Sequence, residues 1–397
     1  METTNGNSKN GLLDSLNIIL QQEPQRITEA KKRGKKVVGY FCPYGTEELI
    51  LAAGMLPVRL AFGGEVKAVS AGEEFLKAYS CTFALSCLGY KILAENFYYN
   101  AVDAVCVAHT YDSMRIVQQY WEKYFNIPAL PLGLPQTHSN NRAKPQAIEY
   151  FRSELELLRK RLGALRGRKI TETEIRKAIT LCNKIREKLL ILYSYPQGRR
   201  SPIEWRQVLK ITQAGFLIDR GIFLKELENI EEALRHIKPD DIKLDERPRL
   251  MIIGSIIGIG DEKLLDIIEQ SGGNIVADSI CTGSMFSRKK VPVFGVMAKP
   301  IDTLAQRYLY NVPCPFMTDQ SRKLKRIIKI ARDYKVHGII FYSLKHNETW
   351  RSEFKPTKDN TYRELSIPSL HIATDYSLSD TAAIKDRIAA FMKLIGG

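Results

Sequence analysis

Short apolar segments alternate with amphipathic segments along most of this 397-residue chain. The apolar segments indicate buried strands, and the amphipathic ones, with apolar residues three and four positions apart, indicate helices. Alternation of this kind predicts an α/β fold built on parallel sheets that helices cover. The expected strands are 37–42, 56–60, 101–109 and 127–136, then 247–254, 274–280, 336–344 and 367–377.

The expected strands form two groups that a long helical stretch separates. A chain of this length accommodates two or three domains. We predict a helical lead-in at 1–35, a first α/β domain at 36–140, a helical segment at 141–246 and a second α/β domain at 247–397.

Most of the net charge of +15 lies in the helical segment, because residues 151–200 contain 14 Lys and Arg but only 5 Asp and Glu. This stretch is either a solvated helical face or a docking surface for an acidic partner or an anionic ligand. No zinc-finger spacing, aromatic RNA-binding signature or arginine-rich arm accompanies it, so we expect no nucleic-acid partner.

The chain shows no membrane or export signal. Its longest apolar run, at 250–260, is broken by three glycines, which argues against a transmembrane helix. The N-terminus is polar and lacks the basic and apolar regions of a secretory signal. We therefore expect a cytoplasmic protein without a membrane partner.

The seven cysteines are an odd number in a chain without an export signal, which indicates free thiols. No CxxC motif is present. Cys106 and Cys182 lie within an expected strand and helix, where a thiol packs as a small apolar group. Four further cysteines lie in or beside expected loops, where either packing or chemistry is possible: Cys42, Cys81, Cys281 and Cys314.

A glycine-rich loop between a strand and a helix contains Gly254, Ser255, Gly258 and Gly260. It is either a tight turn or a binding site for the phosphates of an anionic ligand at a helix N-terminus. Its spacing differs from GxGxxG, and no Walker lysine follows.

Three further residues are acid–base candidates. Glu47 and Glu48 lie in the first turn of an expected helix, and His109 ends an expected strand. Loops at the carboxyl ends of parallel strands collect functional groups, although a structural histidine would also fit at 109.

The sequence resembles the 2-hydroxyacyl-CoA dehydratase and benzoyl-CoA reductase family, and in particular a D-component-like subunit. The resemblance implies two flavodoxin- or Rossmann-like domains with an iron–sulfur cluster between them, and a second subunit with an ATP-dependent iron–sulfur activator. It also implies single-electron, ketyl-radical chemistry on a CoA thioester. The segments that carry it, in order, are VGYFCPYGTEELILAAGMLPVRL, SCTFALSCLG, HTYDSMR, DSICTGSM, VPCPF, GIIFYSLK and TDYSLSDTAAIKDRIAAF.

The family usually holds its [4Fe–4S] cluster with three cysteines. Cys81 matches one of these positions, Tyr111 occupies the second, and His346 or Asn347 occupies the third. Cluster iron prefers thiolate, but histidine replaces it in some clusters. The resemblance therefore implies Cys81, with His346 as a replacement ligand.

Cys42, Cys281 and Cys314 also match family positions and form an alternative ligand set. Two functions follow from the resemblance. The chain is either a cluster-binding subunit of an acyl-CoA dehydratase or reductase, or a cluster-less structural subunit that supports a cluster-bearing partner.

Overall fold

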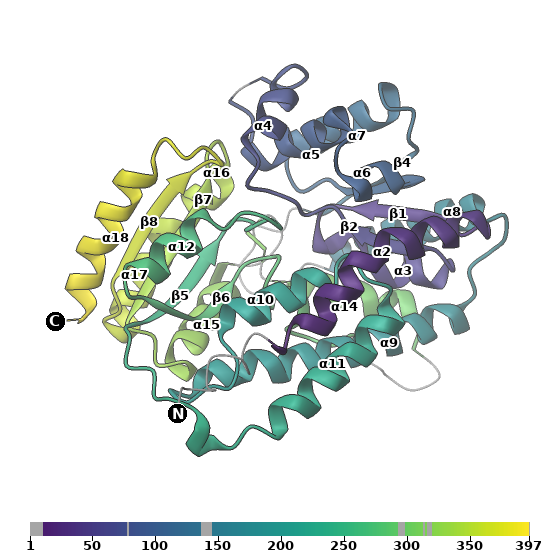
Figure 1. The fold of residues 1–397 in the computed structure, drawn as a ribbon. Coiled ribbons are helices and arrows are strands. Elements are labelled where there is room, and N and C mark those ends of the chain that lie inside the picture. The colour runs from purple at the N-terminus through teal and green to yellow at the C-terminus, as the bar shows by residue number, and fades with distance from the viewer. Residues whose placement is uncertain are drawn as a thin grey trace.

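The computed structural model describes residues 11–77, 79–135, 145–292, 298–312, 314–315 and 320–396. Two four-stranded sheets lie in separate lobes of this part of the chain (Figure 1). All eight expected strands are confirmed, whereas the expected boundary between residues 140 and 141 lies outside the described residues. The strands are β1 (Val37–Tyr40), β2 (Leu56–Arg59), β3 (Ala104–Ala108), β4 (Ala129–Leu132), β5 (Arg249–Gly254), β6 (Asn274–Ser279), β7 (Gly338–Leu344) and β8 (Ser369–Thr374).

The two sheets have the same strand order. The first runs β2-β1-β3-β4 and the second β6-β5-β7-β8, and every neighbouring pair is parallel. This is the order of flavodoxin-like sheets, so the structure has the predicted fold class of two Rossmann-like units. Because all strands of a sheet point the same way, their carboxyl ends share one edge.

Helices cover both sheets, and the lead-in helix α2 is confirmed. Of the helices that the structure describes, none is both long and apolar enough to cross a membrane. The helices are α2 (Asp14–Lys32), α3 (Glu47–Ala52), α4 (Val66–Glu73), α5 (Thr82–Leu93), α6 (Phe97–Ala101), α7 (Asp112–Lys123), α8 (Pro145–Arg166), α9 (Glu172–Ser194), α10 (Trp205–Ala214), α11 (Arg220–Arg235), α12 (Lys263–Gln270), α13 (Ser284–Ser287), α14 (Pro300–Asn311), α15 (Gln320–Asp333), α16 (Glu348–Ser352), α17 (Phe354–Leu365) and α18 (Thr381–Gly396).

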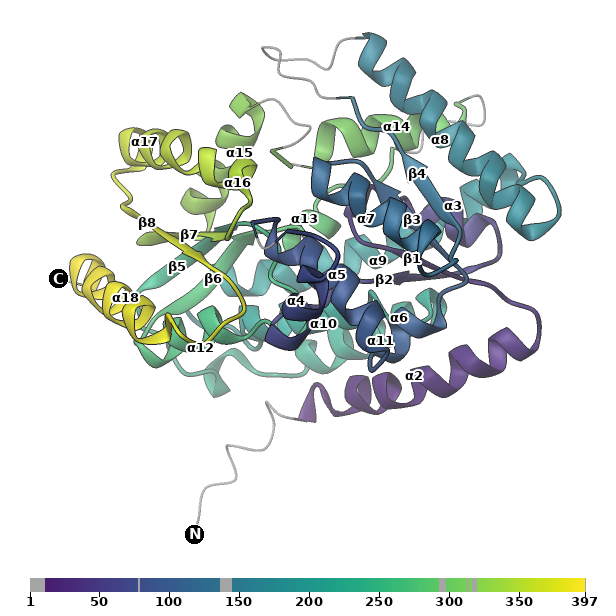
Figure 2. The same cartoon turned by 90° about the horizontal axis from the view of Figure 1, so that it is seen from above.

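The helical segment α8–α11 connects the lobes (Figure 2). Helix α9 begins with a capping box in which Thr171 and Glu174 satisfy each other's backbone N–H groups, and it packs on α3 of the first lobe and α13 of the second. Helix α14, which follows β6 in the chain, packs on α8 and α9 rather than on the second sheet. The division into domains by residue number remains a prediction.

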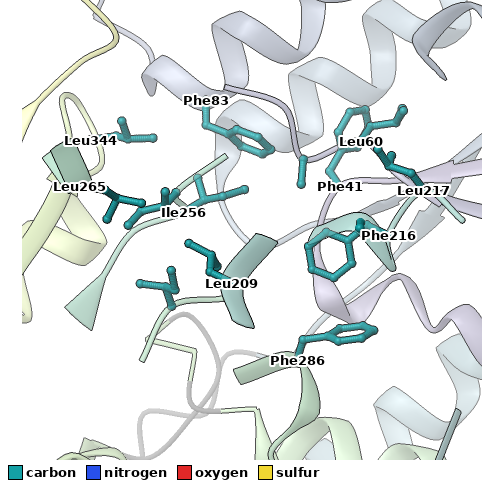
Figure 3. Close-up of a cluster of buried hydrophobic side chains, with 14 of the residues drawn as sticks. Phe41, Leu60, Phe83, Leu209, Phe216, Leu217, Ile256, Leu265, Phe286 and Leu344 are labelled. Carbon is teal, nitrogen blue, oxygen red and sulfur yellow. The ribbon is translucent and has the colours of Figure 1, made fainter. Parts of the chain in front are cut away.

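A continuous apolar core runs through both lobes and the helical segment. Figure 3 shows the region where the three parts meet. Apolar side chains of the two lobes and of the helical segment are buried together in this core. Their burial holds the carboxyl ends of the two sheets against each other. The labelled side chains come from the first lobe (Phe41, Leu60, Phe83), the helical segment (Leu209, Phe216, Leu217) and the second lobe (Ile256, Leu265, Phe286, Leu344).

Candidate functional site

A cavity of about 60 Å³ lies between the two lobes, where carboxyl ends of strands from both sheets meet. Loops after five different strands contribute to its wall. This is the position at which open parallel sheets bind ligands. The contributing residues include Phe41 after β1, Thr110 after β3, Ser255 after β5, Cys281 after β6 and Asn347 after β7.

The wall of this cavity is mostly apolar and aromatic, with Tyr44, Phe83 and Trp350 among its residues. Its volume has room for only a few water molecules. Ser255 is 1% exposed, and its hydroxyl has no hydrogen-bond partner among the described residues. A buried hydroxyl without a partner costs free energy, so Ser255 supplies an unused donor and acceptor at this wall.

The three positions that the family resemblance assigns to cluster ligands come together beside this cavity. Cys81 is 1% exposed. The Tyr111 hydroxyl lies 3.5 Å from the Cys81 Sγ, and the Asn347 Nδ2 lies 3.6 Å from it. Each of the three residues immediately precedes a helix, α5, α7 or α16, which explains how distant segments converge on one point.

Of the two candidates for the third position, the structure brings Asn347 to Cys81, and the role of His346 as a ligand remains a prediction. Asn347 is buried and its Oδ1 accepts a hydrogen bond from the Trp350 N–H at 3.3 Å, which fixes its amide. His346 is exposed on a turn with a φ of +61°, and the structure does not bring its imidazole to Cys81.

This trio does not fit a cluster held by three thiolates. It contains one thiol, and burial raises the pKa of the Tyr111 phenol well above its ordinary value, so the phenol stays neutral. The Asn347 amide directs its Nδ2, a donor, at the sulfur. Across the described parts of the chain, no group of three Cys, His, Asp or Glu side chains has a geometry that could hold a metal ion.

The alternative set lies at the same cavity, because Cys42, Cys281 and Cys314 all line it. Burial raises the pKa of Cys42 to about 12 and also raises that of Cys281, although Arg59 opposes both increases. These thiols share a cavity but do not form a metal-binding group in the described structure.

Comparison with known proteins identifies the family. The model for 2-hydroxyglutaryl-CoA dehydratase, D-component, matches residues 42–395, which is nearly the whole chain. The chain belongs to this family. The resemblance recognised from the sequence motifs is thereby confirmed.

Several known proteins align with this chain over most of their length. A dehydratase subunit of Escherichia coli (strain K12) is 26% identical over 93% of this chain and 94% of its own. The (R)-phenyllactyl-CoA dehydratase beta subunit of Clostridium sporogenes is 25% identical over 98% and 100%. A benzoyl-CoA reductase subunit of Thauera aromatica is 26% identical over 77% of each chain. The last two relatives are subunits of enzymes that are named for CoA thioesters.

In this member of the dehydratase family, Glu47 and Glu48 lie in a buried ion-pair network. Glu48 Oε1 lies 2.5 Å from Arg186 Nη2, and Glu48 Oε2 accepts from the Tyr308 hydroxyl at 2.7 Å. Glu47 Oε2 lies 2.8 Å from Arg220 Nε. Burial acts to raise the pKa of Glu48, but the charges of Arg186 and Arg307 and the hydrogen bonds from Tyr308 and Arg186 together hold the pKa below its ordinary value. The network joins α3 to α9 and α11, and neither carboxylate lines the cavity.

His109 also lies outside the wall of the cavity, although its neighbours Thr110 and Tyr111 are part of it. Its Nε2 lies 2.5 Å from the Gln118 Oε1 on α7. The acid–base roles of His109, Glu47 and Glu48 remain predictions.

The glycine-rich loop after β5 packs against the first lobe. The Ile259 N–H donates to the Ala61 carbonyl at 2.7 Å, and the Gly63 N–H donates to the Ile259 carbonyl at 3.0 Å. A Cβ at position 258 would lie 2.6 Å from the Gly63 nitrogen, so the two backbones approach too closely for a side chain at Gly258. The loop therefore contributes to the contact between the lobes.

The rest of this loop is also constrained. Gly254 and Gly260 have φ of +132° and +95°, which glycine adopts most readily. The Ser255 N–H donates to the Tyr342 carbonyl at 2.9 Å. A phosphate site at Gly254, Ser255, Gly258 and Gly260 remains a prediction, and several of the loop's backbone groups are already used within the protein.

Two residues of the interface were not predicted from the sequence. Asp261 is 5% exposed, and its Oδ2 accepts from the Tyr342 hydroxyl at 2.8 Å. Burial raises the pKa of Asp261 to about 6. Arg59 is fully buried at the end of β2. A charged residue within the otherwise apolar segment LPVRL is the signal that could have revealed it.

Proposed function

We propose that this chain is a subunit of a 2-hydroxyacyl-CoA dehydratase-like or benzoyl-CoA reductase-like enzyme, and that it supports a cluster-bearing partner without a three-thiolate cluster of its own. The family match and the subunit names of its relatives support the enzyme class. The proposal that this chain lacks a three-thiolate cluster rests on the two neighbours of Cys81, which are a phenol and an amide instead of two thiols.

In this proposal, the iron–sulfur cluster and the single-electron chemistry belong to the partner subunit, which an ATP-dependent activator supplies with electrons. The chain's own residues have other tasks. The Tyr111 hydroxyl and the Asn347 amide hold the Cys81 sulfur in a dry environment, and Asn347 connects the second lobe to that point. Ser255 offers its hydroxyl to a small polar group at the cavity.

The cavity is too small for a whole CoA thioester. Its volume of about 60 Å³ accommodates only a few atoms, so any CoA thioester that this subunit contacts lies mainly outside the cavity or at the partner. This limit favours a supporting role over an independent active site.

The test is anaerobic purification of the chain alone and together with a subunit that is encoded beside it and has all three family cysteines. We expect the isolated chain to hold no iron or sulfide above background, and the pair to elute as a complex larger than 45.2 kDa in chromatography with light scattering. The cluster-less assignment would be refuted if the isolated chain held stoichiometric iron, if Cys81→Ala removed that iron, and if Cys182→Ala in helix α9 did not. A monomer in the presence of the partner would refute the subunit assignment.

A further inference from the structure

A basic groove of about 680 Å³ lies on the surface of the helical segment, at the hairpin that joins α8 to α9. Its wall consists of the C-terminal half of α8 and the connecting residues 167–170. Four of the lining side chains are cationic and one is acidic, and none is aromatic. The groove is therefore a concave part of the basic stretch 151–200. Its charged residues are Arg159, Lys160, Arg168, Lys169 and Glu156.

The hairpin holds this basic groove in one shape. Gly167 follows the last residue of α8 with a φ of +84°, and α9 begins with its capping box. Arg159 Nε donates to the Ile170 carbonyl at 2.9 Å, which ties α8 to the connection. Arg168 Nη2 lies 2.9 Å from the Glu174 Oε1 on α9. A partner therefore meets a preformed surface, and binding orders few groups of this chain.

Two of the four cations have no counter-ion. Lys160 and Lys169 are exposed, and neither pairs with a carboxylate in the described parts of the chain. By contrast, Arg159 lies 3.4 Å from a carboxylate oxygen of Glu156, and Arg168 pairs with a carboxylate on α9. Unpaired cations beside partly compensated ones attract a partner that carries several negative charges.

The basic groove is separate from the cavity between the lobes. Near the start of α8, Glu154 accepts from the Gly133 N–H, just after β4, at 2.8 Å. At the end of α8, Arg166 Nη1 donates at 2.7 Å to the carbonyl of Ala52, which ends α3 shortly before β2 begins. Helix α8 thus runs from the carboxyl edge of the first sheet to its amino edge, on the side of the first lobe that faces away from the second sheet (Figure 2). The groove lies toward the amino edge, whereas the cavity lies at the carboxyl edge.

We propose that the basic groove docks a carboxylate-rich segment of another protein. A phosphate site fits less well, because the first turn of α9 contains Glu172 and Glu174, which repel an anion at that helix N-terminus. Nucleic acid fits less well because the wall has no aromatic side chain on which a base could stack. A second copy of this chain is disfavoured as the occupant, since each copy has a net charge of +15.

This docking surface goes beyond the function proposed above, because it requires neither a CoA thioester nor a cluster. Its test therefore uses the full chain alone, with a dye-labelled synthetic peptide that alternates glutamate and glycine. Fluorescence anisotropy measures binding, and a peptide that alternates glutamine and glycine controls for the backbone and the dye. We expect only the glutamate peptide to bind, and added salt to weaken its binding. No binding of the glutamate peptide at low ionic strength would overturn the proposal.

Two double variants that change the net charge equally locate the binding surface. Lys160→Glu with Lys169→Glu should weaken peptide binding about tenfold, because each change replaces an attraction with a repulsion. Lys177→Glu with Lys184→Glu should bind like wild type, because these lysines are exposed on α9 and do not line the basic groove. Equal weakening in both double variants would contradict the proposal, since the attraction would then come from net charge alone.

Two further measurements complete the test. Lys160→Gln with Lys169→Gln removes the two charges without reversing them, and this variant should bind with intermediate affinity. Inorganic phosphate should compete with the peptide no better than chloride does at the same ionic strength, and stronger competition by phosphate would show a phosphate site instead. Circular dichroism of each variant confirms that it is folded.

Discussion

Replacing Asp261 with asparagine should stabilise the protein at neutral pH and leave its stability unchanged at acidic pH. The Asp261 carboxyl is buried at the contact between the lobes, where its strongest neighbour is the Tyr342 hydroxyl at 2.8 Å. Burial raises its pKa from an ordinary 3.8 to about 6, and the hydrogen bond from Tyr342 and the charge of Lys263 offset only part of this increase.

The sign and size of the effect follow from proton linkage. Because the pKa is higher in the folded state, the folded chain keeps the Asp261 proton after the unfolded chain has lost it. The stabilising contribution is complete below pH 3.8 and disappears as the pH rises through about 6. The difference between the two pKa values is about 2, and each pKa unit corresponds to about 1.4 kcal/mol, so the contribution that is lost amounts to about 3 kcal/mol.

Asparagine at this position has nearly the shape of the protonated carboxyl and still accepts the hydrogen bond from Tyr342, but it does not ionise. The free energy of unfolding in urea, followed by circular dichroism from pH 4.5 to 7.5, should therefore diverge between wild type and Asp261→Asn. The variant should gain up to about 3 kcal/mol at pH 7.5 and only about 1 kcal/mol at pH 4.5, and the difference should vanish below pH 3.8.

Asp359→Asn on helix α17 is the matched control, because its carboxylate is exposed and pairs with Lys355. It should follow the pH profile of wild type. A stability difference between Asp261→Asn and wild type that is the same at every pH would refute the reasoning, because the ionisation of Asp261 would then make no contribution.

Three other perturbations test the remaining structural conclusions. Tyr111→Cys combined with Asn347→Cys should let the anaerobically reconstituted chain bind iron and sulfide, because both new thiols point at Cys81. Tyr111→Cys combined with His346→Cys should not restore binding, because only the first pair directs both thiols at Cys81. Equal iron content in the two double variants would contradict this placement. Glu48→Gln should lower the free energy of unfolding by about 3–5 kcal/mol, since it leaves a buried arginine without its carboxylate, and an unchanged urea midpoint would show that the ion pair is not needed. Gly258→Val should lower the thermal midpoint and reduce the free energy of unfolding by about 1–3 kcal/mol, because its side chain would meet the backbone of the first lobe. Calorimetry with CoA thioesters on the same variant would show whether the loop also binds an anion.

The sequence by itself determined the strands and the fold class. Each strand depends on its own apolar residues, and parallel pairing follows from the helices between strands, so the two predicted sets of four strands match the structure. The motifs also determined the family, since seven short segments in a fixed order are a one-dimensional signal that needs no geometry.

Tertiary structure decided which side chains share a site. His346 and Asn347 are neighbours in sequence, and only the turn after β7, with its φ of +61° at His346, exposes the first and brings the second to Cys81. From the sequence, Glu48 is only a carboxylate in the first turn of a helix. The fold places it against Arg186, which is 138 positions away in the chain. Local periodicity depends on near neighbours in the chain, whereas these contacts depend on how the lobes pack, and no local pattern encodes that packing.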